Sequence, residues 1–490
     1  MRNILQGRDL EISELREKLK SRKSELVVIY GRRRVGKSAI IRAFLQSLKR
    51  ERASTEKTSK TTNKNSQSAG PLCLTFEGLE KQRTPIQIKH FTDQLRAQVD
   101  DPLLKQAQFQ DWSQLFEYLT HLSAQKKEKS VIAFDEFQWM AAAQTKLVSL
   151  IKYYWDNYWQ QNNMILILCG SIASFMVKKV IRSKALYGRI TLELPVRKLS
   201  VSNCKHFFPK SKSDEEILKS IMVYGGVPKY LLDLSPSSSF EQNLEKLFFR
   251  VNSLYLEEYE KIFSVHFKEP QTYLHIIKIL QKKPLTLAEI SQAIRMKSSG
   301  GVKAYLENLE LAEFIRPNYC YQNNSTKKMQ YRVSDEFLNF YTHFVLPNMN
   351  IIKAGGGRGI VNGRLRTQLN GWLGLAFENY VLNNAIYFAN LMGFGDLVES
   401  FGSYRSRESG VQVDLIYSRS DRTTSICEMK FSMTPISTEV IREFQIKLSK
   451  IPNRSKYSIQ KILIAPNGVS SALAVSGYFD IILTNSQIFR

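Results

Sequence analysis

The sequence has few cysteines, and their arrangement indicates neither a disulfide framework nor a zinc site. The five cysteines are odd in number and widely scattered, with no CxxC pair. Disulfide scaffolds and structural zinc sites depend on closely spaced or regularly patterned cysteines. We therefore expect ordinary core thiols in a reducing compartment.

Long hydrophobic runs are also missing. The most apolar stretches, such as Met164 to Cys169, are much shorter than the roughly 20 residues that a helix needs to cross a bilayer. The opening residues, MRNILQGRDLEISEL, carry charge where a secretory signal would be apolar. The sequence therefore predicts a cytoplasmic protein without a membrane partner.

Acidic residues are scarce relative to basic ones. The 490 residues contain 70 Lys+Arg against 45 Asp+Glu, which gives a formal net charge of +25. This charge favours polyanions such as nucleic acid, although a generally basic proteome would produce the same balance. With 43% hydrophobic and 23% charged residues, the composition predicts several globular domains and excludes a mostly disordered chain.

Changes in residue pattern along the chain divide it into modules. Short apolar runs alternate with helix-like segments over the first 230 or so residues, which predicts an α/β fold with a parallel sheet. A polar stretch from Lys49 to Pro71 interrupts this pattern. It reads as a flexible surface insertion, with a basic DNA-binding arm as the alternative.

From Pro270, three short helical segments precede two strand-like runs, which is the order of a winged helix-turn-helix. The predicted domains are 1–232 (P-loop α/β domain, insertion at 49–71), 233–268 (helical lid or connector), 269–347 (winged helix-turn-helix), 348–364 (Gly- and Arg-rich linker) and 365–490 (α/β domain).

The string GRRRVGKS satisfies the pattern G-x-x-x-x-G-K-[ST] between a predicted strand and a predicted helix. In that context backbone N–H groups wrap phosphates, Lys37 reaches the outer phosphates, and the Ser38 hydroxyl binds Mg²⁺. The sequence therefore predicts an ATP site. The expected ATP-binding residues of this loop are Gly31, Arg32, Arg33, Arg34, Val35, Gly36, Lys37, Ser38 and Ala39.

An acidic pair, Asp135 and Glu136, directly follows the apolar run SVIAF. We expect Asp135 to hold Mg²⁺ together with Ser38, and Glu136 to orient and polarise the attacking water. Such a pair could instead be a simple helix cap. The phosphate-loop pattern makes a catalytic pair, and hence ATP hydrolysis, the favoured interpretation.

Six motifs in order resemble the archaeal-type ATPases of the AAA-related branch of P-loop proteins. They are QGRDLEISEL, VVIYGRRRVGKSAIIRAF, IAFDEFQW, LILCGS, ALYGRI and YGGVPKYL. The resemblance covers most of Asn3 to Leu232 and implies ATP binding and hydrolysis. The resemblance also implies that Gly7 and Arg8 lie near the adenine end of the nucleotide and that Ser171, in the ATP site, senses the γ-phosphate. It further implies that Arg189 is a catalytic, finger-like arginine and that Gly225, Gly226 and Pro228 belong to a lid. A neighbouring subunit or a lid would have to bring Arg189 to the phosphates, so a homo-oligomer is one expectation.

A second constellation lies near the C-terminus. Asp414 stands in one strand-like run, Glu428 and Lys430 in the next, and Glu378 on a preceding helix. A strand places Glu428 and Lys430 on one face. Asp414 and Glu428 could hold Mg²⁺ or Mn²⁺, Lys430 could support the nucleophile, and Glu378 could orient the site or bind a second ion. The alternative is an ordinary hairpin with a surface ion pair.

This constellation resembles the restriction-endonuclease-like (PD-(D/E)xK) fold, although Val413 replaces the proline that often precedes the aspartate. Gln445 and Lys447 lie on the next helix, where such enzymes often carry auxiliary polar residues. The sequence therefore predicts an ATPase module, a winged-helix connector and a nuclease-like domain, with ATP, Mg²⁺ and DNA as partners. The alternative is an ATP-dependent signalling or regulatory switch whose last domain binds DNA or protein without cleaving anything.

Overall fold

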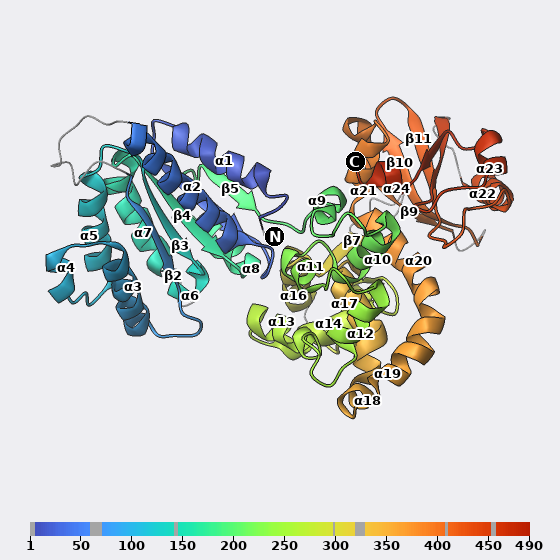
Figure 1. Cartoon of the computed structure of the whole chain (residues 1–490), viewed down its shortest axis with the longest axis horizontal. Coiled ribbons are helices and arrows are strands. Elements are labelled where there is room, and N and C mark those ends of the chain that lie inside the picture. The colour runs from blue at the N-terminus through green and yellow to red at the C-terminus, as the bar shows by residue number, and fades with distance from the viewer. Residues whose placement is uncertain are drawn as a thin grey trace. The chain divides into compact units, whose positions relative to one another are not determined.

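The computed structural model of the chain describes residues 5–58, 71–141, 146–296, 299–318, 329–406, 410–451 and 457–490. The chain divides into two compact units, Met1–Leu199 and Ser200–Arg490. Figure 1 labels the elements of both units, and each unit is described by itself. The first unit ends before the predicted boundary at residue 232, so the expected lid residues around Gly225 belong to the second unit.

The first unit is built on a five-stranded parallel sheet of order β2-β3-β4-β1-β5. Its strands are β1 (Glu25–Tyr30), β2 (Cys73–Glu77), β3 (Ser130–Asp135), β4 (Met164–Gly170) and β5 (Leu192–Pro195). The predicted α/β fold with a parallel sheet is confirmed. In this order β4 lies between β1 and β3, so the segments that follow all three strands meet at one edge of the sheet.

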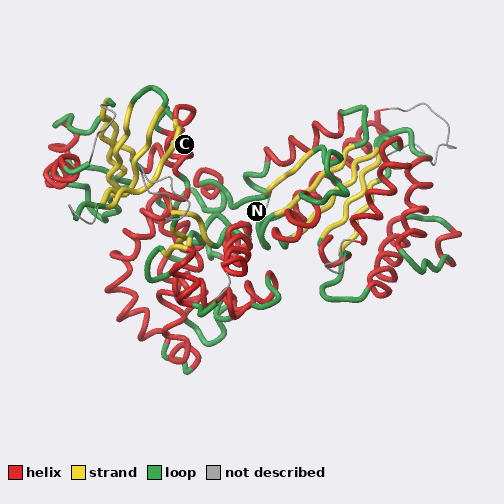
Figure 2. The backbone as a smooth tube through the Cα atoms, turned by 180° about the vertical axis from the view of Figure 1, so that it is seen from behind, coloured by secondary structure: helices red, strands yellow, loops and turns green. Residues whose placement is uncertain are grey.

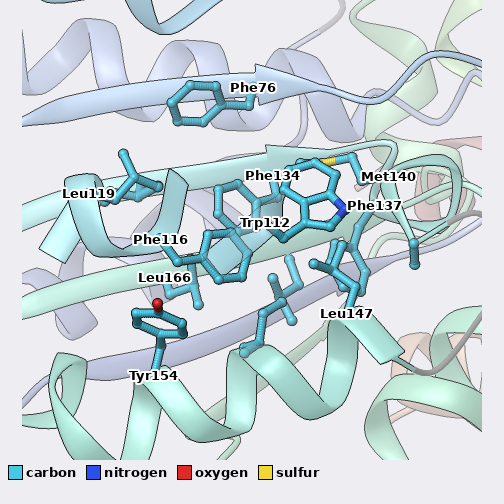
Figure 3. Packing of buried hydrophobic residues seen from close by; sticks show 14 of the residues in the cluster. Phe76, Trp112, Phe116, Leu119, Phe134, Phe137, Met140, Leu147, Tyr154 and Leu166 are labelled. Carbon is cyan, nitrogen blue, oxygen red and sulfur yellow. The ribbon is translucent and has the colours of Figure 1, made fainter. Parts of the chain in front are cut away.

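Helices cover both faces of this sheet (Figure 1). They are α1 (Asp9–Lys20), α2 (Lys37–Thr58), α3 (Thr84–Gln98), α4 (Pro102–Gln106), α5 (Trp112–Ala124), α6 (Phe137–Met140), α7 (Lys146–Asn157) and α8 (Ala173–Phe175). Because side chains alternate along a strand, Val27 and Ile29 pack with α1 and α2, whereas Leu26 and Val28 pack with the other core. That second core is rich in aromatic residues, several of which Figure 3 shows packed between β3 and the helices α5 and α7.

Helix α2 continues further than the sequence predicted. Residues 49–58, expected to begin a flexible insertion, form its last turns, and 59–70 lie outside the described residues. Lys, Arg, Glu and Ala dominate the segment after Lys49, and these are strong helix formers. Glu51 also accepts a hydrogen bond at 2.9 Å from Arg16 of α1, so this part of α2 pairs with a neighbouring helix.

The second unit begins with helices and a small sheet. The helices are α9 (Val201–Lys205), α10 (Asp214–Tyr224), α11 (Pro228–Asp233), α12 (Phe240–Phe248), α13 (Glu258–His266), α14 (Pro270–Leu280), α15 (Leu287–Ala293), α16 (Ser299–Leu311) and α17 (Glu336–Phe340). The strands β6 (Leu285–Thr286), β7 (Ile315–Asn318) and β8 (Gln330–Val333) form an antiparallel sheet of order β6-β8-β7. Lys297, Lys327 and Lys328 of this segment lie outside the described residues.

The segment expected to be a linker is helical. Residues 348–364 contain α18 (Met349–Lys353), α19 (Gly357–Ile360) and most of a π-helical turn, Val361–Leu365, that leads into α20 (Arg366–Asn383). A Cβ atom at Gly357 would lie 1.7 Å from the Phe249 carbonyl oxygen. The glycine therefore allows α19 to touch the end of α12, a close packing contact rather than a loose connection.

The C-terminal part is a mixed sheet of order β13-β12-β11-β10-β9, drawn as yellow strands in Figure 2. Its strands are β9 (Val398–Arg405), β10 (Gln412–Arg419), β11 (Thr423–Met429), β12 (Ser458–Ile464) and β13 (Ile481–Leu483). The strands β9, β10 and β11 are antiparallel, whereas β11, β12 and β13 run parallel. The remaining helices are α21 (Ala385–Leu391), α22 (Glu439–Ser449), α23 (Ser471–Val475) and α24 (Asn485–Ile488).

Candidate active sites

The loop between β1 and α2 has a backbone that only particular residues tolerate. Gly31 has φ 151°, and a Cβ atom there would lie 2.2 Å from the Val196 carbonyl oxygen. Gly36 has φ 99°, and Arg34 is held at φ 72°. Such positive values favour glycine and strain a larger residue. The loop therefore has a fixed shape at the N-terminus of α2, where free N–H groups attract anions.

Lys37 is the first residue of α2, and its side chain is only 5% exposed. Its Nζ donates a hydrogen bond to the Arg32 carbonyl oxygen at 2.9 Å, so the ammonium folds back over the loop. Burial lowers the pKa of Lys37, whereas acidic groups at the ends of β3 and β4 act in the opposite direction. A buried ammonium group at the N-terminus of a helix is well placed to bind an anion.

Arg8 is buried against the phosphate-binding loop of its own unit. Its side chain is 3% exposed, and its guanidinium donates to the carbonyl oxygens of Val35 at 2.8 Å and Arg197 at 2.7 Å. It also pairs with Glu11 at 2.7 Å. These contacts tie the phosphate-binding loop to the segments before α1 and after β5. A contact with adenine stays a prediction.

The acidic pair lies where β3 ends. Asp135 is 9% exposed, and its Oδ1 accepts the Glu136 N–H at 2.9 Å. Glu136 has φ 50° and is the N-cap residue of α6. Its Oε2 accepts hydrogen bonds from Ser171 Oγ at 2.8 Å and from Gln138 Nε2. The structure therefore brings the predicted Ser171, at the end of β4, directly to Glu136.

Gln138 was not singled out from the sequence. It is 1% exposed and bonds both Glu136 and Ser171, the latter at 3.2 Å. Gln138 follows Glu136 by two residues, and this spacing matches no known sequence motif. Only the fold shows that Gln138 fixes the carboxylate.

Arg189 does not reach this edge of its own sheet. Its guanidinium makes two hydrogen bonds to Asp156, at 2.6 and 2.8 Å. Asp156 also pairs with Lys152 at 3.0 Å. Arg189 precedes β5, and Asp156 lies in α7, which precedes β4, so the pair lies toward the amino ends of these parallel strands. The phosphate loop and Ser171 instead follow the carboxyl ends of β1 and β4. A finger-like role therefore stays a prediction that requires a second copy of the chain.

The C-terminal constellation is brought together by β10, β11 and α20. The register that pairs Leu415 with Cys427 places Asp414 opposite Glu428 at the next position. Asp414 is 7% and Glu428 1% exposed. Lys430, just after β11, lies 3.3 Å from Glu428 Oε1.

Three carboxyl groups lie near enough here to influence one another electrostatically. Burial raises the pKa of Glu378 to about 7, with further contributions from Asp414 and Glu428. Burial also raises the pKa of Asp414 to about 6, and the charge of Glu428 adds to this effect. Burial and repulsion between neighbouring carboxylates both raise the pKa of a carboxyl group. The four residues predicted from the sequence therefore lie in one cluster.

Two residues of α22 complete the cluster. Lys447 Nζ donates to both carboxylate oxygens of Glu428, at 2.8 and 2.6 Å. Glu443 accepts from Lys430 Nζ at 3.0 Å. The sequence indicated Lys447 only as an auxiliary residue, and it gave no signal for Glu443.

The donor chemistry of both sites fits a divalent cation. Asp135 with the Ser38 hydroxyl, and Asp414 with Glu428, supply the hard oxygen ligands that Mg²⁺ and Mn²⁺ prefer. No group of three or more His, Cys, Asp or Glu side chains that could hold a metal occurs among the described residues. Within the same residues, no helix is long and apolar enough to span a membrane.

Comparison with known proteins identifies a family. An ATPase domain found predominantly in Archaea matches residues 5–234. The uncharacterized protein MJECL04 of Methanocaldococcus jannaschii is 30% identical over 377 residues, covering 76% of this chain and 75% of the relative. The uncharacterized ATP-binding protein MJ0423 of the same organism is 45% identical over 48 residues, covering 10% of this chain and 81% of the relative.

Solved structures are similar to the chain at lower identity. The Walker-type ATPase PABY2304 of Pyrococcus abyssi has a TM-score of 0.49 and 18% identity, covering 70% of this chain and 96% of that one. The ORC2 protein of Aeropyrum pernix has a TM-score of 0.44 and 13% identity, covering 73% of this chain and 95% of that one.

Proposed function

Because the chain belongs to the family of ATPases found predominantly in Archaea, we propose that it hydrolyses ATP and thereby controls a C-terminal domain that binds or cuts DNA. The observation that supports hydrolysis best is the position of Glu136. Its carboxylate lies at the edge of the sheet from which the phosphate loop leads into α2. Ser171 and Gln138 hold this carboxylate in place.

The roles of the residues follow from their chemistry. The Lys37 ammonium would leave the Arg32 carbonyl and bind the outer phosphates of ATP. Glu136 would orient the attacking water and accept its proton. Mg²⁺ held by Ser38 and Asp135 would offset phosphate charge when bound. Ser171 would keep the Glu136 carboxylate aimed at the phosphates.

An active oligomer is part of this proposal. Arg189 is bound to Asp156 within its own chain. Arg189 can stabilise transition-state charge only if a second copy of the chain presents its bound phosphates to the amino ends of these strands. Such an arginine contributes about 10³ to 10⁵ in rate where it operates.

The segment 269–347 would act as a winged helix. Its elements follow the order helix, strand, helix, helix, strand, strand, from α14 to β8. Arg295 and Lys303 are exposed there, whereas α16 also carries Glu307 and Glu310. The acidic residues disfavour insertion of α16 into a groove, so we expect contacts to the DNA backbone.

A basic surface on α19 and α20 supports the same proposal. Residues 349–377 contain no Asp or Glu, whereas Arg358, Arg364 and Arg366 are exposed. Arg358 lies 3.5 Å from Glu245 but keeps 84% of its side chain exposed. Arginine side chains of this kind neutralise phosphates without reading sequence.

The C-terminal cluster would be a nuclease-like centre. Asp414 and Glu428 would hold Mg²⁺ or Mn²⁺, which when bound would polarise a scissile phosphate. Lys430 would orient the attacking water, and Glu378 would accept a proton or hold a second ion. The alternative function is a regulatory switch in which this domain binds DNA or protein and cuts nothing.

DNA cleavage distinguishes these two functions. Plasmid, linear duplex and single-stranded DNA are incubated with wild type, Lys430→Ala or Lys37→Ala, in Mg²⁺ or Mn²⁺, with and without ATP. The nuclease proposal expects cleavage by wild type, loss of cleavage in Lys430→Ala, and an altered ATP response in Lys37→Ala. Intact DNA in every reaction, with ATP turnover normal, would contradict the nuclease and favour the switch.

A further inference from the structure

Glu428 of the nuclease-like cluster is already neutralised from within the chain. Lys447 reaches it from α22 and donates to both of its oxygens, at 2.8 and 2.6 Å. Glu428 is 1% exposed, whereas the Lys447 side chain is 24% exposed. The buried carboxylate therefore has its cation on the side that opens to solvent.

Lys430 interacts less closely with the same carboxylate. Its Nζ lies 3.3 Å from Glu428 Oε1 and 3.0 Å from Glu443 Oε2, so its charge is shared between two acids. Lys447 forms no ion pair with a second acid within the described residues. Of the two ammonium groups, Lys447 is the one that engages both oxygens of Glu428.

A divalent cation needs those same oxygens. Placing Mg²⁺ or Mn²⁺ between Asp414 and Glu428 would add a further positive charge beside a buried carboxylate that Lys447 and Lys430 already contact. A charge-assisted hydrogen bond between buried partners is also stronger than an ordinary one. A metal ion at Glu428 would therefore compete with the ammonium of Lys447.

We propose that Lys447 is an internal counter-ion that competes with the metal ion for Glu428 and keeps the C-terminal centre unloaded until an anion draws the lysine away. This inference rests on the proposed metal centre. The phosphate backbone of DNA supplies such an anion, because an ammonium that leaves a carboxylate for a phosphate keeps its charge paired. By linkage, DNA would then raise metal affinity and metal would raise DNA affinity by the same factor.

The test measures metal binding directly, without an activity readout. Mn²⁺ affinity of the full-length protein is determined by calorimetry without nucleotide for wild type, Lys447→Met and Lys447→Gln. Arg442→Met is the matched control, because it removes one exposed positive charge from the same helix. We expect both Lys447 variants to bind Mn²⁺ about tenfold to a hundredfold more tightly than wild type, and Arg442→Met to match wild type.

Thermal unfolding provides a second measurement of metal binding in case the Lys447 substitutions destabilise the domain. With chelator, Lys447→Met should unfold at a lower temperature than wild type, because it leaves a buried carboxylate without its cation. Added Mn²⁺ should raise the unfolding temperature of the variant more than that of wild type.

The outcomes separate the two proposals. Equal Mn²⁺ affinity in wild type and both Lys447 variants would overturn the counter-ion role and leave the metal centre standing. An equal gain in Arg442→Met would also overturn it, because general charge would then explain the effect. Absence of Mn²⁺ binding in every variant would overturn the metal centre and the counter-ion role together.

Discussion

Replacing Glu378 by glutamine should stabilise the C-terminal domain at high pH and leave it unchanged at low pH. Burial and the neighbouring Asp414 and Glu428 raise the pKa of Glu378 from 4.5 to about 7. Glu378 therefore keeps its proton up to about pH 7 in the folded protein, whereas the unfolded chain loses it near pH 4.5. Since the unfolded state releases this proton first, the free energy of unfolding falls as the pH rises between these values.

The size of the effect follows from the same two pKa values. One pKa unit corresponds to about 1.4 kcal/mol, so the rise from 4.5 to about 7 costs the wild type at most about 3 kcal/mol above pH 7. Below pH 4.5 the cost approaches zero, because Glu378 is protonated in both states. The Glu378→Gln variant never ionises and avoids this cost.

Urea unfolding, followed through hydrogen exchange of the amides of β10 and β11, measures this difference at pH 4.5 and pH 8 with chelator present. The variant should exceed wild type by up to about 3 kcal/mol at pH 8 and by less than about 0.5 kcal/mol at pH 4.5. Glu399→Gln, at an exposed position of β9, is the control and should show no such change with pH. An equal difference between Glu378→Gln and wild type at both pH values would contradict a raised pKa of Glu378 in the folded protein.

Three further predictions follow from the site, the packing and the charge. Glu136→Gln should bind ATP normally but lower kcat by about 10² to 10⁴, because it removes the proton acceptor; fluorescent-nucleotide binding and phosphate release check this, and unchanged kcat would contradict the role. Gly357→Ala should destabilise the protein by at least about 2 kcal/mol, because its Cβ would meet the Phe249 carbonyl oxygen. Gly359→Ala on the same helix has open space around its Cβ and should be neutral or up to about 1 kcal/mol stabilising; similar melting shifts for both would contradict the packing argument. Affinity for duplex DNA should fall steeply between 50 and 200 mM salt, roughly tenfold or more, and a flat dependence would remove the electrostatic basis for DNA binding.

Local sequence patterns predicted the nucleotide-binding half well. The apolar runs of β1, β3 and β4 are long and are followed directly by polar motifs, so strand, loop and helix could be placed from residue type alone. Their common edge follows from the rule that parallel strands present their carboxyl ends together. Asp135, Glu136 and Ser171 meet for that reason.

Contacts between distant segments could not be predicted in the same way. The glycines of 348–364 suggested a flexible linker, because glycine lowers helix propensity, yet Gly357 is required by the close approach to Phe249. Gln138 and Glu443 were missed because their partners are defined by the fold and by no spacing rule. The pairing of Lys447 with Glu428 joins a helix to a strand 19 residues earlier, and only their packing reveals it.

ATP hydrolysis by Lys37→Ala tests the central claim most directly. Lys37 begins α2, is buried, and has its ammonium over the loop that the family comparison assigns to an ATPase domain. Phosphate release is measured for wild type, for Lys37→Ala, and for Lys20→Ala as an exposed lysine control. We predict turnover by wild type and Lys20→Ala and only background release by Lys37→Ala. Wild-type turnover in Lys37→Ala would contradict the account.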